Sequence, residues 1–330
     1  MTHHFLVNPA AGKGKVTDAL IRKIHRICRL RGVRYELHMT TRPGDATEYV
    51  RAVAAVKSDE RHRFYACGGD GTLCEVINGA PRATNAEFAV IPIGTGNDFV
   101  RNFSGPENFF DIDRQLDGET RAIDLIRYND RFALNAVNIG FDCAAAIKTS
   151  EIKRSSLVPS GLAYAAGVAI TFCKPFGTQM KIELSDGSIL EDQFLLTAFS
   201  NGSFYGGGFQ PAPRASLTDG LIDVCLVNKL SRVKFLGMVS SYKNGTHLDN
   251  PAIARYIRYM QTDKIRITFD HPTNICADGE PEMTDFVEIE SVPGALSFSI
   301  PRGSCLRAEL PAESSETSEE PVAAASLSEQ

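Results

Sequence analysis

The stretch RFYACGGDGTLCEV, from Arg63 to Val76, places an apolar run directly before three glycines that surround an aspartate and a threonine. The run FYAC is short, apolar and bounded by glycine, which is typical of a buried strand. Each glycine loses extra conformational freedom on folding. A cluster of them at the end of a strand therefore indicates that something large must approach the backbone there. The segment LCEVINGA that follows predicts a helix.

The same order of strand, glycine loop and helix occurs twice more in the first 125 residues. FLVNP runs into AAGKGK, and FAVIPI runs into GTGND and then FVRNF, with Gly94 falling 26 residues after Gly68. Behind the first loop, a helix ended by Gly32 is predicted from one apolar face: Val16, Leu20, Ile24, Ile27 and Leu30. Strands that alternate with helices predict an α/β domain with a doubly wound, mostly parallel sheet.

In such a sheet, ligands bind outside the carboxyl ends of the strands, where these glycine loops lie. Glycines let backbone N–H groups approach phosphate oxygens, and the N-termini of the following helices favour negative charge. The common nucleotide fingerprints are nevertheless absent. Gly14-Lys15 is followed by Val16 where a P-loop has Ser or Thr, and Gly94-Thr95-Gly96 lacks the last glycine of GxGxxG. Three glycine loops, two of them with an aspartate beside Gly and Thr, predict a phosphate site of another kind.

From about Leu125 the pattern changes to short alternating strands such as QMKIEL, DQFLLTAFS, LIDVCLV and DKIRITF. Alternation and turn glycines predict antiparallel sheets and a β-sandwich-like second domain. We expect a phosphate-binding α/β domain over residues 1–125, a β-rich domain over 126–300, and a C-terminal segment over 301–330. Its Ser-, Glu- and Ala-rich part from about 311 is expected to be disordered.

Charge and composition exclude several classes of function. The formal net charge is −5, but without the five glutamates after Pro311 the chain has 35 acidic and 35 basic residues, which argues against a nucleic-acid binder. The eight cysteines are scattered and show no CxxC spacing, which is typical of buried thiols in a cytoplasmic protein. The uncharged stretch 155–173 contains Pro159, Gly161 and Gly167, so we expect a buried helix there and no transmembrane segment, with contact to a membrane surface as the alternative.

Five motifs together resemble the diacylglycerol kinase catalytic-domain superfamily of soluble bacterial lipid kinases. They are NPAAGKGK, GGDGT, PIGTGNDFVR, SLTDGLIDV and DGE, which occur in family order over roughly residues 5–300. GGDGT alone is also found in NAD kinases, whereas the ordered set is specific. The resemblance implies ATP-dependent phosphorylation of a hydroxyl of diacylglycerol or a related lipid, giving a phospholipid such as phosphatidic acid. It also implies an active site in the cleft between the two domains.

The resemblance further implies roles for individual residues. Asp70 and Asp98 match acidic positions around the phosphates and magnesium, and Glu280 of the DGE motif matches the catalytic glutamate that accepts the proton of the lipid hydroxyl. From the residues alone, Asp98 is equally an N-cap of the helix FVRNF. The nucleotide-binding positions are Asn8, Pro9, Ala10, Ala11, Gly12, Thr40, Gly68, Gly69, Asp70, Gly71, Thr72, Leu73, Cys74, Thr95 and Asp98. Cys74 departs from the asparagine that is common in the family, and a thiol is the poorer hydrogen-bond donor.

In the second domain, the resemblance implies a structural Mg²⁺ in SLTDGLIDV. Its ligands would be the carboxylate of Asp219 and the main-chain oxygens of Ser216 and Leu221, and such hard oxygen ligands suit Mg²⁺. From the residues alone, Asp219 is a turn aspartate before a strand. The implied cofactors are therefore ATP and Mg²⁺, and the implied partner is a lipid at a membrane surface.

Two other functions remain alternatives: a soluble-metabolite kinase of the NAD kinase type and a non-catalytic nucleotide- or lipid-binding module. The sequence indicates a cytoplasmic protein, with peripheral contact to the inner face of the membrane as a further alternative. It leaves the lipid and the oligomeric state open, a homodimer included.

Overall fold

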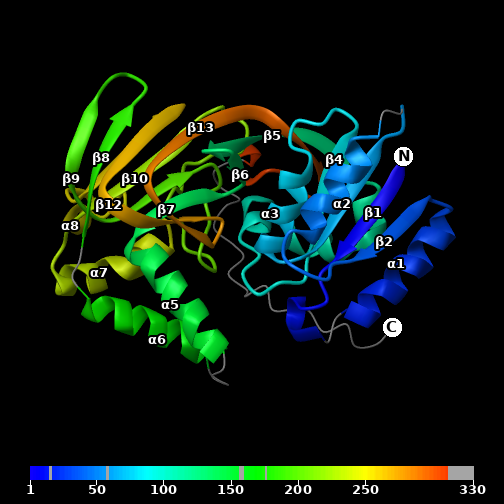
Figure 1. Ribbon diagram of the computed structural model, residues 1–330, viewed down its shortest axis with the longest axis horizontal. Helices are drawn as coiled ribbons and strands as arrows, with labels where there is room; N and C mark the ends of the chain where they lie inside the picture. Colours follow the sequence, from blue (N-terminus) through cyan, green and yellow to red (C-terminus); the bar gives the residue numbers. More distant parts are fainter. Residues whose placement is uncertain (15–16, 57–58, 156–159, 175–176, 311–330) are drawn as a thin grey trace. The chain divides into compact units, whose positions relative to one another are not determined.

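The computed structural model describes residues 1–14, 17–56, 59–155, 160–174 and 177–310, and the chain forms two compact units (Figure 1). Unit 1 comprises Met1–Ile123 and the segment from Gly294 on, and unit 2 comprises Asp124–Pro293. The expected bounds of the second domain, 126–300, stay a prediction, and in the structure the chain returns to unit 1 at Gly294. The acidic tail expected from about residue 311 lies outside the described residues.

Unit 1 is built on parallel strands, as predicted. Its main elements are β1 (Thr2–Val7), α1 (Thr17–Arg31), β2 (Tyr35–Met39), α2 (Asp45–Ala54), β3 (His62–Gly68), α3 (Asp70–Gly79) and β4 (Ala86–Pro92). Short elements complete it: η1 (Ala11–Gly14), η2 (Phe99–Asn102), η3 (Pro106–Phe110), α4 (Ile112–Leu116) and η4 (Arg307–Glu309). β1 pairs in parallel with β2 and β3, and β3 pairs in parallel with β4.

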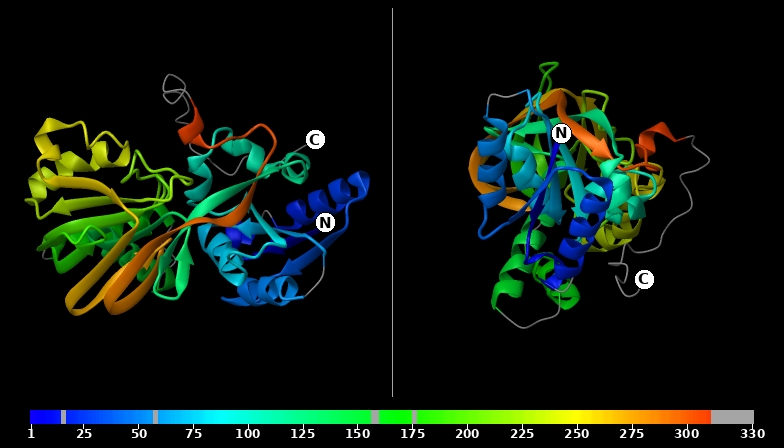
Figure 2. Two further views of the ribbon diagram at one scale, coloured as in Figure 1. Left: turned by 90° about the horizontal axis from the view of Figure 1, so that it is seen from above. Right: turned by 90° about the vertical axis from the view of Figure 1, so that its right-hand side faces the viewer.

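The sheet of unit 1 is covered on both faces. Every residue of β1, β3 and β4 is buried, which is the burial expected of parallel strands between two helical layers. The right-hand view of Figure 2 shows α1 and α2 on opposite sides of these strands. The last part of the chain adds a strand, because Phe298 pairs in parallel with Phe88 of β4.

One detail of α1 differs from the prediction. Leu20, Ile24 and Cys28 form its buried face, whereas Leu30 is 76% exposed. Successive helical residues are rotated by about 100°, so Leu30 stands about 200° around the helix from Cys28. The predicted face was therefore wrong at its last position.

Unit 2 is β-rich. Its strands are β5 (Glu119–Tyr128, which begins in unit 1), β6 (Arg131–Ala133), β7 (Ala136–Gly140), β8 (Thr178–Leu184), β9 (Ile189–Ser200), β10 (Ile222–Asn228), β11 (Ile257–Thr262), β12 (Lys264–Ala277) and β13 (Glu280–Ile300, which ends in unit 1). Its helices are α5 (Phe141–Ser155), α6 (Ser160–Cys173), α7 (Arg232–Lys243) and α8 (Pro251–Ala254). The sequence prediction missed β11 and the helices α5, α7 and α8.

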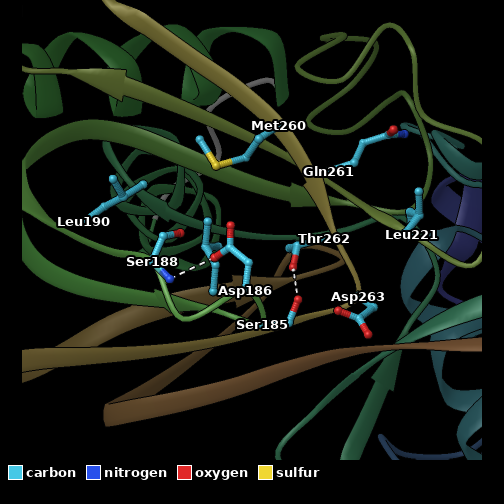
Figure 3. Close-up of a pocket in the computed structure, with 10 residues that line it drawn as sticks. Ser185, Asp186, Ser188, Leu190, Leu221, Met260, Gln261, Thr262 and Asp263 are labelled. Atoms are coloured by element: carbon cyan, nitrogen blue, oxygen red, sulfur yellow. Dashed lines mark hydrogen bonds between the residues drawn. The ribbon is translucent and has the colours of Figure 1, made fainter.

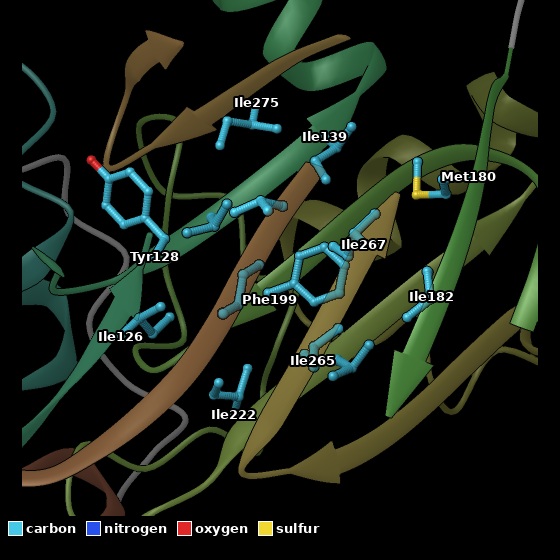
Figure 4. Packing of buried hydrophobic residues seen from close by; sticks show 14 of the residues in the cluster. Ile126, Tyr128, Ile139, Met180, Ile182, Phe199, Ile222, Ile265, Ile267 and Ile275 are labelled. Atoms are coloured by element: carbon cyan, nitrogen blue, oxygen red, sulfur yellow. The ribbon is translucent and has the colours of Figure 1, made fainter. Parts of the chain in front are cut away.

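The strands of unit 2 pair antiparallel, as predicted. Hydrogen bonds link them in the order β11-β10-β9-β7-β12-β13, and β8 pairs with both β9 and β12. Ile139, Phe199, Ile222 and Ile265 contribute to a fully buried core between these strands (Figure 4). The alternate residues Cys225 and Val227 of β10 belong to a second cluster, in which Phe235 and Met238 of α7 cover the sheet.

The uncharged stretch 155–173 is helical over α6, but the helix is not fully buried. Leu162 is 63% exposed and Ile170 is 41% exposed, so the expectation of a buried helix was wrong for these positions. Among the described helices, none has both the length and the apolarity needed to cross a bilayer.

Candidate active site

The parallel strands of unit 1 bring the predicted nucleotide loops to one edge of the sheet. Val7, the last residue of β1, lies beside Met39 of β2 and Cys67 of β3, and Gly68 lies beside Pro92 of β4. The loops that begin at Asn8, Thr40, Gly69 and Ile93 therefore start side by side. Hydrogen bonds from the Asn8 N–H to the Cys67 oxygen (3.0 Å) and from the Thr40 N–H to the Val7 oxygen (2.9 Å) continue this pairing into the loops.

The side chain of Asn8 joins the first loop to the start of α3. Its Nδ2 donates to Thr72 Oγ1 (3.0 Å), while its Oδ1 accepts from the Ala10 N–H (3.0 Å). A Cβ at Gly68 would overlap the Thr72 side chain. The first glycine of GGDGT thus leaves room for the threonine that holds Asn8.

The two glycine loops also touch each other. The Gly94 N–H donates to the Gly68 oxygen (3.1 Å), and a Cβ at Gly94 would overlap the backbone of Gly69. These glycines therefore have a structural cause inside the protein: each loop is the large group that approaches the other. The sequence analysis predicted that a ligand approaches these glycines. The contact between the two loops is by itself a sufficient reason for glycine at both positions.

Asp70 fastens this contact. Its Oδ2 accepts from the Asp98 N–H (3.1 Å) and its Oδ1 accepts from the Phe99 N–H (3.2 Å). Burial raises the pKa of Asp70, while these backbone hydrogen bonds oppose the rise. The carboxylate thereby caps η2, the 3-10 turn that stands where we predicted the helix FVRNF.

Asp98 stands at the N-cap position of η2, as the alternative predicts, but its own side chain makes no capping hydrogen bond. Its Oδ1 lies 3.4 Å from Arg101 Nε, and 10% of its side chain is exposed. Phe99, the next residue, is buried and packs edge-on against Phe298, with 5.0 Å between ring centroids. These contacts hold the end of the GTGND loop, between β4 and η2, in place.

The predicted nucleotide-binding positions differ in exposure. Thr95, Pro9 and Ala10 are exposed, and Gly69, Asp70 and Gly71 are partly exposed at the N-terminus of α3. Leu73 is 1% exposed and Cys74 is 5% exposed, so these two side chains pack in the interior. Asn8, Ala11, Gly12 and Thr40 are partly exposed, and Gly68, Thr72 and Asp98 are buried. The surface formed by the two loops presents backbone N–H groups and a helix N-terminus, which can bind phosphate oxygens.

In unit 2, Glu280 follows a turn fixed by Asp278. The Asp278 carboxylate accepts from the N–H groups of Leu134 (2.6 Å), Asn135 (2.9 Å) and Ala136 (3.1 Å). Asp278 itself has a φ of 47°, in the left-handed region that aspartate tolerates better than most residues. Glu280 is exposed. The DGE motif thus combines a partly buried anchor, Asp278, with an exposed carboxylate, Glu280.

Three carboxylates lie around the segment from Ser216 to Asp223. Asp219 accepts from the Leu221 N–H (3.0 Å), and Asp124, which the sequence analysis did not single out, accepts from the Gly220 N–H (2.7 Å). Burial and the negative charge of Asp124 raise the pKa of Asp219. Within the described ranges, no three His, Cys, Asp or Glu side chains converge as metal ligands. The Mg²⁺ site that the sequence predicts is not such a cluster, because it combines one carboxylate with two main-chain oxygens.

The sequence analysis also missed a buried carboxylate, Asp142, directly after β7. Tyr205 donates a short hydrogen bond to Asp142, the Tyr205 and Tyr242 hydroxyls lie 3.2 Å apart, and the Cys143 N–H donates to Asp142 over 2.9 Å. Burial raises the pKa of Asp142 to about 6. Its burial depends on Tyr205, 63 residues away, so the local sequence held no signal for it.

A pocket of about 520 Å³ opens beside the predicted metal segment (Figure 3). Its lining joins apolar and polar side chains: Leu184, Ser185, Asp186, Ser188, Leu190, Leu221, Met260, Gln261, Thr262 and Asp263. Gln261 Nε2 also reaches Asp219 (3.4 Å) and Asp223 (3.3 Å). Gln261 therefore links the lining of the pocket to the carboxylates of this segment.

Comparison with known proteins agrees with this geometry. Residues 2–128 match the family described as "Diacylglycerol kinase catalytic domain", and residues 135–300 match "YegS C-terminal NAD kinase beta sandwich-like domain". The chain is 26% identical to the "Diacylglycerol kinase" of Bacillus subtilis (strain 168) over 83% of this chain and 88% of the relative. It is 30% identical to a "Probable lipid kinase YegS-like" of Pseudomonas aeruginosa over 84% of this chain and 88% of the relative.

A solved structure shows the same fold. The crystal structure of a diacylglycerol kinase from Bacillus anthracis str. Sterne matches with a TM-score of 0.66 at 23% identity, covering 91% of this chain and 97% of that one. The matched families span both units of the chain. The predicted two-domain architecture and the resemblance of the motifs are thereby confirmed, and the chain belongs to the diacylglycerol kinase family of lipid kinases with a YegS-type C-terminal domain.

Proposed function

We propose that this lipid kinase uses ATP to phosphorylate a hydroxyl of diacylglycerol or a closely related lipid, giving phosphatidic acid or its analogue. The observation that supports this most is the pair of glycine loops that Asp70 fastens together at the edge of the parallel sheet. Phosphoryl transfer needs little covalent chemistry from the protein, so catalysis depends on positioning and on charge stabilisation. A rigid double loop of backbone N–H groups suits that task.

We assign the nucleotide to Asn8–Gly12, Gly68–Thr72 and Thr95, with Thr40 at the margin. Asp70 serves as a positioning residue, because both of its oxygens already accept backbone N–H groups. Asp98, whose carboxylate lies beside Arg101, is the better candidate for the acidic group at the metal–phosphate end of the nucleotide. Mg²⁺ bound with ATP would neutralise phosphate charge.

We assign the proton of the lipid hydroxyl to Glu280. Its carboxylate is exposed, and the Asp278 turn holds the adjacent backbone in place. A general base must lie within hydrogen-bond reach of the proton that it removes. The active site in the cleft between the two domains, which the motifs implied, stays a prediction, as do the cytoplasmic location and the oligomeric state.

A structural Mg²⁺ fits the Asp219 segment chemically. The negative charge of Asp124 makes ionisation of Asp219 more costly, a cost that a cation would relieve, and the oxygens are hard ligands. We expect Mg²⁺ to raise the melting temperature of the wild type, because a ligand that binds only the folded state stabilises it. Asp219→Ala should lose this response, while Asp130→Ala, at an exposed turn, should keep it. Equal responses in all three proteins would reject the site.

The function is tested with γ-labelled ATP, Mg²⁺ and a mixed lipid extract in detergent, counting label in the organic and aqueous phases. A lipid kinase places label in the organic phase, and Glu280→Gln should abolish most of it. Label that appears only in a water-soluble product on addition of NAD would favour the NAD kinase type instead. Nucleotide binding without any labelled product would favour a binding module. A panel of pure lipids then identifies the acceptor.

A further inference from the structure

Helix α7 presents an apolar face to solvent. Val233 is 80% exposed and Leu236 is 62% exposed, and they stand three residues apart on one side of the helix. The opposite side, with Phe235, Met238 and Tyr242, is buried against the sheet. Two large apolar side chains that are exposed together on a well-packed helix indicate an interaction surface.

The surroundings of these side chains are basic. From Val224 to Leu248 the chain has no acidic residue, but it has four basic ones: Lys229, Arg232, Lys234 and Lys243. The nearest acids along the chain on either side already have partners, since Asp249 lies 4.0 Å from Arg214 and Asp223 accepts from Tyr259.

Tyr256 adds an amphipathic side chain to this surface. Its ring packs against the core beneath α7, Lys234 donates a short hydrogen bond to its hydroxyl, and Arg255 lies 4.9 Å from the ring centroid. The hydrogen bond from Lys234 and the charges of Arg255 and Lys234 lower the pKa of Tyr256. Tyrosine with one apolar and one polar end is favoured at membrane interfaces.

Helix α6 is joined to the same surface. Arg232 Nε donates to the Phe172 oxygen (3.0 Å) at the end of α6, and Figure 1 shows α5, α6 and α7 close together in unit 2. Ile170 and Lys174, near this junction, are exposed. The apolar and basic side chains therefore extend beyond α7.

We propose that the α7 surface, defined as Val233, Leu236, Lys234, Arg255 and Tyr256, docks the protein on an anionic lipid bilayer. Apolar side chains with lysine and arginine around them are the combination that interfacial helices use, and each basic side chain near an anionic surface adds to the attraction. The proposal rests on the proposed function in one respect: docking on a bilayer would give a lipid kinase access to its substrate. Binding to vesicles is measured without ATP, so its failure and a failure of kinase activity are separate results.

The chain contains no tryptophan, so a single introduced one reports its own surroundings. Leu236→Trp should show a blue shift of its emission on addition of vesicles that contain phosphatidylglycerol, and a smaller shift with pure phosphatidylcholine. Met283→Trp is the matched control, because Met283 is about as exposed as Leu236, at 65%, but lies on β13, outside the α7 surface. Equal shifts at both positions, or none at either, would overturn the proposal.

Co-sedimentation of the full chain with the same vesicles separates the contribution of the charged side chains to binding from that of the apolar side chains. Lys234→Gln with Arg255→Gln should lower the partition coefficient about 30-fold, from about a fivefold loss for each cation. Val233→Gln with Leu236→Gln should lower it at least about tenfold. Ile189→Gln with Met283→Gln, at exposed positions elsewhere, should leave it unchanged. Self-association that the α7 variants abolish, without vesicle binding, would identify a second copy of the chain as the occupant and overturn the proposal.

Discussion

Glu280 is the residue on which the proposed chemistry depends most directly. Glu280→Gln keeps the shape and hydrogen bonding of the side chain but cannot take a proton, so kcat should fall by about 10²–10⁴-fold. The KM for ATP and the melting temperature should hardly change, because Glu280 is exposed and the nucleotide loops lie elsewhere in the chain. Asp285→Asn, an exposed carboxylate on the same strand, is the control. Turnover within about threefold of the wild type, well below that range, would exclude Glu280 as the base.

Asp142 should show the stability cost of a buried carboxylate. Burial raises the folded-state pKa of Asp142 to about 6, above its ordinary value of 3.8. Between these two values the folded state binds more protons than the unfolded state, so this contribution to stability falls as pH rises through the window. Asp142→Asn removes the charge, and it should therefore stabilise the protein more at pH 7.5 than at pH 5 in thermal unfolding. A stability difference that is the same at both pH values would contradict the assigned pKa. Asp130→Asn, at an exposed turn, serves as the control.

At the scale of elements, the glycine loops act as one unit because Asp70 joins them. Asp70→Asn replaces one carboxylate oxygen by an amide group that cannot accept, so one of the two N–H groups of η2 loses its partner. Leaving such a group unsatisfied costs about 1–3 kcal/mol of stability. We expect a lower melting temperature, a higher KM for ATP and a lower kcat. The control Asp18→Asn, at an exposed position of α1, should change none of them. A fall in kcat alone, with unchanged stability and KM, would instead indicate a direct catalytic role for the Asp70 charge.

The elements also show what the sequence could and could not predict. The glycine loops, the parallel strands and the antiparallel second domain follow from local patterns, since alternation and glycine position are visible in short stretches. The role of Asp70 depends on N–H groups 28 and 29 residues away, and the burial of Asp142 depends on Tyr205, 63 residues away. Contacts of that kind are set by the packing of elements, so inspection of the local sequence could not find them.

At the scale of the whole molecule, buried titratable groups in the two units should contribute to stability in opposite directions as the pH falls. In unit 1, burial lowers the pKa of His3 and of His4 to about 4, from 6.5. Between these values the unfolded state binds more protons than the folded state, so this contribution to stability is lost as pH falls from about 6.5 towards 4. In unit 2, the raised pKa of Asp142 works in the opposite sense over pH 3.8 to 6.

Hydrogen exchange can separate these two effects within one chain. On going from pH 7.5 to pH 5, protection factors should fall for peptides from β1, which contains His3 and His4, and from its neighbour β3, after correction for the intrinsic rates. Peptides from β7 and β10 of unit 2 should lose less protection, because protonation of Asp142 relieves its burial cost there. His271→Gln, at an exposed position, should leave this pattern unchanged. A larger loss in unit 2 than in unit 1 would show that other groups dominate the acid response, since neither the buried histidines nor Asp142 can produce it.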